Sequence, residues 1–83
     1  MVNVLADYTF KDGQWGHNEY QVTGVDDIPT ARDIVLNFLE AQGLCVEVLS
    51  IVHGEHTIEE LEQIHASPEN AKGKVIEMFV YDL

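Results

Sequence analysis

Basic residues are scarce in this chain. Lys and Arg together number 4 against 15 Asp and Glu, which gives a formal net charge of −11. A field of this sign repels phosphate backbones and anionic lipid surfaces, so we expect no direct binding to nucleic acid or to membranes. It favours a basic protein as partner, because opposite fields accelerate encounter. Solubility alone would also explain the charge, since acidic proteins repel one another.

Cysteine and long apolar runs are also rare. Cys45 is the one cysteine and cannot form a disulfide within the chain, which fits a cytoplasmic location. The chain has no run of about 18 apolar residues, so we expect no membrane-spanning helix. The first ten residues lack the basic and apolar regions of a secretory signal. The glycine patterns of P-loop, dinucleotide-binding and serine-hydrolase enzymes are missing as well, so we expect no enzyme of these classes.

What the chain does have is apolar content. Hydrophobic residues make up 46% of its 83 residues, which argues against disorder. This length fits a single domain, 1–83, with one modest core.

The first twenty residues predict a β-hairpin. Residues 2–10 alternate apolar and polar side chains, as a half-buried strand does, and 15–22 form a second strand after an Asp-Gly turn signal. A two-residue turn would place the apolar face of one strand against the polar face of the next. A three-residue loop ending at Gly13 pairs Val4 with Tyr20 and keeps one continuous apolar face. We therefore predict the longer loop, which also sets Asp7 opposite His17.

Residues 25–43 predict the main helix. Asp27 is suited to cap its N-terminus and Gly43 to end it. One apolar stripe at helical spacing is expected to face the core, with Tyr8 and Tyr20 across from it. The stripe comprises Ile28, Ala31, Ile34, Val35, Phe38 and Leu39.

The second half of the chain predicts a strand, a short helix and a last strand. Residues 44–52 are apolar on both faces, and 73–83 form the final strand. Between them, Thr57 and Glu60 form a capping box for a helix that Pro68 ends. The order β-β-α-β-α-β predicts an α+β domain, a mostly antiparallel four-stranded sheet with the long helix on one face. The element order is similar to a β-grasp arrangement, as an analogy of architecture only.

Histidines cluster in the segment HGEHTIEELEQIH, which contains three of the four. The spacing of His53, His56 and His65 does not match the H-E-x-x-H pattern of zinc enzymes. The capping box explains the neighbouring glutamates without a metal. We therefore expect no cofactor and no stoichiometric zinc. Cys45 follows a helix C-terminus, which disfavours a reactive thiolate, so a buried structural role is expected.

Two features point to a partner-binding surface. Trp15 is predicted on the outer face of the hairpin, above Leu5 and rimmed by Asp7, His17 and Glu19. Tryptophan is a frequent anchor at interfaces. The alternative is that another part of the chain covers this face.

The second feature is an acidic rim, which includes Glu55, Glu59, Glu60, Glu62 and Glu69. It is either a solvated helix face or a surface that meets Lys and Arg of a nucleic-acid-handling protein. Small acidic chains of phage and mobile elements often inhibit host proteins in this way. We therefore expect a non-enzymatic protein-interaction module. The alternatives are a homo-oligomer subunit that associates through strand edge 74–82, and a small enzyme with a histidine site at an interface.

Overall fold

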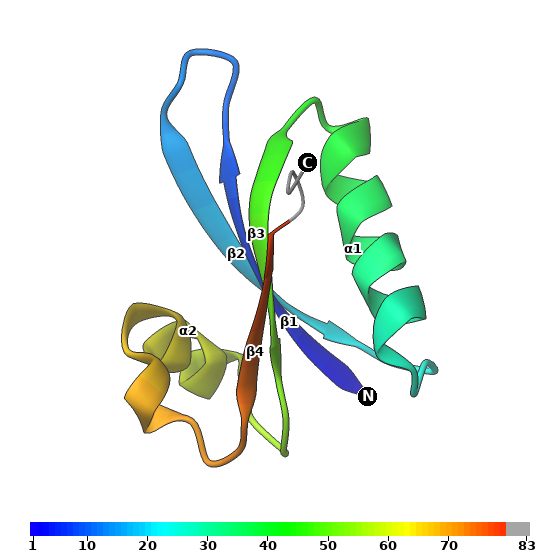
Figure 1. Ribbon diagram of the computed structural model, residues 1–83, viewed down its shortest axis with the longest axis vertical. Helices are drawn as coiled ribbons and strands as arrows, with labels where there is room; N and C mark the ends of the chain where they lie inside the picture. The colour runs from blue at the N-terminus through cyan, green and yellow to red at the C-terminus, as the bar shows by residue number, and fades with distance from the viewer. Residues whose placement is uncertain (80–83) are drawn as a thin grey trace.

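The computed structural model describes residues 1–79 and contains one antiparallel sheet between two helices (Figure 1). The strand order is β2-β1-β3-β4. The strands are β1 (Val2–Thr9), β2 (Trp15–Val22), β3 (Cys45–Val52) and β4 (Val75–Phe79). The helices are α1 (Ile28–Ala41) and α2 (Ile58–Ala66), followed by a 3-10 turn, η1 (Pro68–Asn70).

The α+β prediction and the element order are confirmed. All three strand pairs are antiparallel, including the central pair β1–β3. The last four residues of the predicted final strand, 80–83, lie outside the described part of the chain. Within residues 1–79, neither helix has the length and apolar character needed to cross a bilayer.

The hairpin register is the one predicted from the three-residue loop. Val4 pairs with Tyr20, and Asp7 pairs with His17. Gly13 has a φ of 85°, the left-handed conformation that such a loop requires. Val2, Val4, Ala6 and Tyr8 of β1 therefore face α1, where they form the larger core together with Ala31, Val35 and Leu39.

The α1 helix is capped as expected. The Asp27 side chain accepts hydrogen bonds from the Thr30 backbone N–H and hydroxyl, and Gly43 follows the C-terminus with a φ of 79°. The predicted apolar stripe is too wide, however. Ile34 and Phe38 are exposed, Phe38 to 56%. The helix packs over β1 and β3, so the flank of the stripe that faces β2 stays outside the core.

The β3 strand is covered on both faces over its second half, as its apolar sequence predicts. Its first half carries an irregularity, because Asp7 pairs with Val48 while Tyr8 pairs with Val46, which leaves Glu47 as the extra residue of a bulge. Cys45 was predicted to be buried, and this was wrong: it is exposed at the start of the strand. Neither helix reaches over this end of β3 on the face that Cys45 occupies.

The α2 helix covers the opposite face of the sheet and forms a second, smaller core. Its N-terminus is the predicted capping box, in which Thr57 and Glu60 exchange hydrogen bonds with each other's backbone N–H. Leu61 and Ile64 are buried against Leu5 and Val52. Ile58, one turn before Leu61, remains exposed.

Candidate functional site

A cluster of ionisable side chains lies where the last turn of α2 meets β1 and β2. His65 stands between two carboxylates: its Nδ1 lies 2.7 Å from Glu19 Oε2, and its Nε2 lies 2.9 Å from Asp7 Oδ1. His17 Nδ1 approaches the same Glu19 oxygen at 3.1 Å. The His17 and His65 rings meet edge to face, with centroids 4.9 Å apart. We call these four residues, Asp7, His17, Glu19 and His65, the histidine–carboxylate cluster.

The sheet register and the phase of the helix explain why these residues meet. Asp7 and His17 are direct cross-strand neighbours, and Glu19 follows His17 at the next position on the same face of β2. On α2, Leu61 and Ile64 point into the core, and His65 is the next residue after Ile64. The imidazole is thereby held at the border of the apolar contact, over the polar half of the hairpin face.

Burial differs within the cluster. The Glu19 side chain is 9% exposed and that of His65 11%, whereas the His17 side chain is 66% exposed. A cavity of about 250 Å³ opens beside them and is lined by Asp7, His17, Glu62, His65 and Ala66. The nearly enclosed imidazole of His65 thus stands next to a space that solvent or a ligand can enter.

Three members of the cluster have the arrangement of metal ligands. One ligand atom each of His17, Glu19 and His65 lies within 4.8 Å of the others. The sequence pattern did not suggest this group, because His17 and His65 belong to different elements and only tertiary packing brings them together. The predicted register did place His17 and Asp7 side by side. The sequence does not show which residues of α2 lie over His17 and Asp7.

The histidines considered from the sequence do not form a common site. His53 is exposed, and His56 is buried at the N-terminal end of α2, far along the helix from His65. His56 Nδ1 lies 3.6 Å from Glu60 Oε2, which is too long for a hydrogen bond. Its Nε2 lies 3.3 Å from the carbonyl of His53. The structure therefore gives His56 a role in packing the loop before α2.

The acidic residues of α2, and Glu55 in the loop before it, lie on the outward side of the helix. Glu55, Glu59 and Glu62 are exposed, and within residues 1–79 none of them forms an ion pair with Lys or Arg. Glu60 differs, because it pairs with Lys72 at 3.2 Å and completes the capping box. The Thr57 backbone N–H, and then Lys72, hold the pKa of Glu60 below its usual value. Glu60 is therefore a structural residue more than a free surface charge.

Trp15 and Leu5 were considered from the sequence as one contact patch, but they differ in solvent exposure. Trp15 is 66% exposed, whereas Leu5 is 2% exposed because α2 lies over it. The part of this face around Trp15 is therefore exposed, as a contact patch would be. The part around Leu5 is covered by α2, which is the alternative that the sequence left open. Asp7 and Glu19, predicted to rim the patch, are engaged with His65, and His17 remains at the border toward Trp15. Trp15, His17 and the acidic side of α2 are exposed on this side of the sheet.

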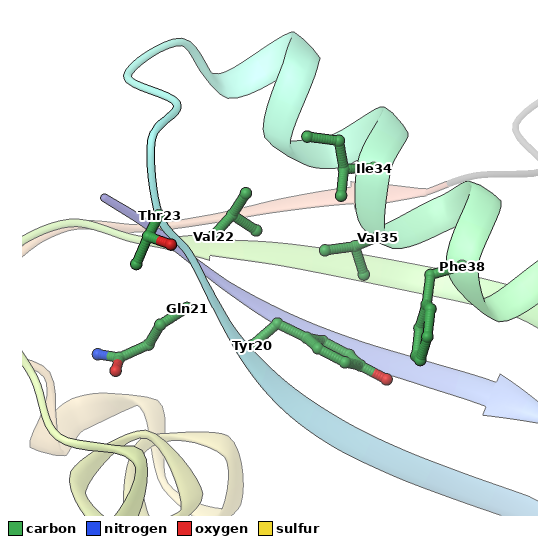
Figure 2. A pocket seen from close by; sticks show the side chains of 7 residues that line it. All are labelled: Tyr20, Gln21, Val22, Thr23, Ile34, Val35 and Phe38. Carbon is green, nitrogen blue, oxygen red and sulfur yellow. The ribbon is translucent and has the colours of Figure 1, made fainter.

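A separate apolar groove of about 400 Å³ lies on the other side of the sheet, between α1 and β2 (Figure 2). Ile34 and Phe38 reach toward Tyr20 and Val22 across it. The Tyr20 and Phe38 rings meet edge to face, with centroids 6.1 Å apart. The groove runs beside β2, which is an edge strand of the sheet.

No protein-family model, no curated protein and no solved structure matches this chain. The likeness of its element order to a β-grasp arrangement therefore stays an analogy, and the function has to be argued from the surface and the cluster themselves.

Proposed function

We propose that this protein is a small, non-enzymatic interaction module that binds a basic protein through the acidic side of α2 and Trp15. The observation that carries this proposal is the division of α2 into two faces. Leu61 and Ile64 fix the helix to the sheet, and Glu59 and Glu62 are left in solvent without a cationic partner among the described residues. Carboxylates held on a packed helix form a fixed negative surface, and a basic partner would neutralise it.

Trp15 supplies the apolar part of the proposed interface. It lies two positions before His17 on the same face of β2, and His17 contacts the last turn of α2 through His65. A large exposed aromatic ring at the margin of a charged surface is the arrangement of an interface anchor with a polar rim. The carboxylates would steer the encounter, and Trp15 would slow dissociation.

The partner class that fits best is a protein whose basic surface ordinarily handles nucleic acid. Carboxylates along a helix present the same sign of charge as phosphates, so they compete for the same Lys and Arg side chains. In this proposal the protein acts in the cytoplasm as an inhibitor of such a protein, of the kind encoded by phage or mobile elements. Its action is occupation of the partner's basic surface, without a chemical step.

The test is a pull-down from lysate of the native host with matched baits. The first variant is Glu59→Lys with Glu62→Lys, which reverses two exposed charges and leaves the capping box in place. The control is Asp33→Lys with Glu40→Lys on α1, which changes the net charge equally on the opposite face. We expect a basic protein, identified by mass spectrometry, on the wild-type and control baits and not on the α2 variant.

Equal capture by both variants would contradict the proposal, because the position of the charge would then be irrelevant. A Trp15→Ala bait separates the two parts of the interface. Its expected effect is faster dissociation, with a loss of affinity of about ten-fold or more, as for an interface anchor. Circular dichroism of each bait verifies that α2 still forms.

A second candidate is a homo-oligomer subunit, and the apolar groove favours it. Ile34 and Phe38 are exposed next to an edge strand, and a second copy that paired with β2 would cover them. The net charge of −11 opposes self-association, so we rank this candidate second. Sedimentation of wild type and Phe38→Ser at high salt decides it: a dimer that Phe38→Ser dissociates would support the candidate, and a monomeric wild type would exclude it.

A further inference from the structure

The number of N–H groups on the His65 ring limits which of its contacts can be hydrogen bonds. Both ring nitrogens face carboxylate oxygens, at 2.7 and 2.9 Å. An ionised carboxylate only accepts hydrogen bonds, and a neutral imidazole carries a single N–H, so a neutral His65 can satisfy one of the two contacts. The Nδ1 of His17 adds a third nitrogen directed at Glu19 Oε2. A cation shared by Glu19 and the two rings would leave the Nε2–H of His65 free to donate to Asp7.

We propose that His17, Glu19 and His65 bind one Zn²⁺ ion, and that Asp7 orients His65 for this role. Two imidazole nitrogens and one carboxylate form a ligand set that suits zinc and disfavours Ca²⁺ and Mg²⁺, which take oxygen ligands. The proposal departs from the sequence-based expectation that the purified protein holds no stoichiometric zinc. It also goes beyond the proposed partner binding, which requires no metal.

The distances from Glu19 to the two rings fit such an ion. Ligands at about 2.0–2.1 Å from a tetrahedral zinc stand about 3.3 Å from one another. The two Nδ1 atoms lie 3.1 and 2.7 Å from Glu19 Oε2, and the three ligand atoms fall within 4.8 Å of each other. Small side-chain rotations would bring all three to bonding distance. The ion would then take the place of protons between Glu19 and the two rings.

The contact of Asp7 has the form expected of an outer carboxylate. Histidines that bind a metal through one nitrogen usually donate the other N–H to a carboxylate or carbonyl. With zinc on Nδ1, the Nε2–H of His65 would donate to Asp7 Oδ1 at 2.9 Å. This assigns a use to both nitrogens of His65, which a single neutral tautomer does not provide. The hydrogen bond to Asp7 would also hold the His65 ring in the orientation that directs Nδ1 at the proposed ion.

The scaffold is suited to holding an ion. His17 and Glu19 project from one face of β2, and His65 projects from α2, so the ligands come from two elements that contact each other. Glu19 is more than nine-tenths buried and points at the proposed position. The cavity of about 250 Å³ beside the cluster has room for a water molecule as fourth ligand. A three-ligand site of this kind has an open coordination position.

The experiment is a calorimetric titration of the EDTA-treated full chain with ZnCl₂, with the metal content checked by mass spectrometry. We expect one zinc per chain and a rise in Tm of about 10 °C when free zinc exceeds the Kd 100-fold. Asp7→Ala should lower the affinity about 10–100-fold, as loss of an outer carboxylate does. His17→Gln, which removes a ligand, should lower it further.

The variants distinguish this site from loss of folding and from binding elsewhere. His17 is largely exposed, so its replacement leaves the core intact even if a His65 variant disturbs α2. His53→Gln is the matched control, because His53 is an exposed histidine outside the cluster, and its affinity should equal that of wild type. In NMR spectra, zinc should shift the ring nitrogens of His17 and His65 and not that of His53.

Absence of zinc binding at micromolar concentration would overturn the proposal. Equal affinity of wild type and His17→Gln would overturn it too, because the ion would then lie elsewhere. Neither result bears on partner capture by the acidic side of α2, because that capture requires no metal.

Discussion

His65 in the last turn of α2 and Glu19 on β2 are joined by a contact of 2.7 Å between Nδ1 and Oε2, although 46 residues separate them in the sequence. This contact ties the second helix to the edge of the sheet at its C-terminal end. Leu61 and Ile64 hold the same helix by apolar packing. The direction in which α2 presents its acidic side is therefore set by both kinds of contact, and the proposed function depends on it.

The apolar attachment of α2 can be tested at Leu61. Its side chain is fully buried in the smaller core, so Leu61→Ala should lower the free energy of unfolding by about 2–5 kcal/mol. Ile58→Ala on the same helix is the control, because Ile58 is exposed, and it should cost less than about 1 kcal/mol. Urea denaturation measures both. Equal losses would mean that α2 does not pack as described.

The capping box makes a separate prediction. Thr57→Ala removes the hydroxyl that accepts the Glu60 backbone N–H and should lower the free energy of unfolding by about 1 kcal/mol. Thr57→Ser keeps the hydroxyl and should retain most of the stability. A Thr57→Ser variant as unstable as Thr57→Ala would assign the loss to the missing methyl group and not to the cap.

Stability should depend on pH through the two helix caps. Hydrogen bonds from the Thr30 side chain and backbone hold the pKa of Asp27 below 3.8, and the Thr57 N–H and Lys72 hold that of Glu60 below 4.5. Because the pKa values are lower in the folded state, the stabilisation is present above the unfolded values and is lost as the pH falls through the folded ones.

The comparison that isolates this effect uses Asp27→Asn with Glu60→Gln, since both replacements can still cap a helix without charge. Thermal melts from about pH 7 to about pH 3 should show wild type above the variant at neutral pH and the gap closing in acid. A gap that stays constant over this range would show that the two carboxylates contribute no charge-dependent stability.

The exposed position of Cys45 predicts its reactivity. In the native protein one thiol per chain should react with a disulfide reagent such as DTNB, at a rate close to that in denaturant, because the side chain lies in solvent. Absorbance of the released thiolate measures the rate. Protection of the native thiol by more than about 100-fold would contradict the exposed position and favour the buried one expected from the sequence.

Local signals predicted most of the fold. Gly13 and the alternation on either side of it gave the hairpin register, and Asp27, Gly43 and Thr57 gave the helix ends. Each of these features depends on residues close in sequence, where turn geometry and capping decide the conformation.

Exposure and the histidine–carboxylate cluster were harder to predict, because both depend on where the helices lie over the sheet. Phe38 fits the apolar stripe of α1 but stays exposed, since the helix packs over β1 and β3. For Leu5 the sequence left open an exposed contact patch or a cover by another part of the chain, and α2 covers it. His17 and His65 meet only through that same packing. Periodicity shows which face of an element is apolar, and it does not show how far a neighbour covers it.

The association rate of the captured basic partner, measured against salt concentration, tests the proposed function most directly. For wild type and for Asp33→Lys with Glu40→Lys, we expect the rate constant to fall about ten-fold or more between low and high salt. For Glu59→Lys with Glu62→Lys, it should be low throughout and nearly independent of salt. Equal rates and salt dependence for all three proteins would contradict the proposal that the acidic side of α2 is the binding surface.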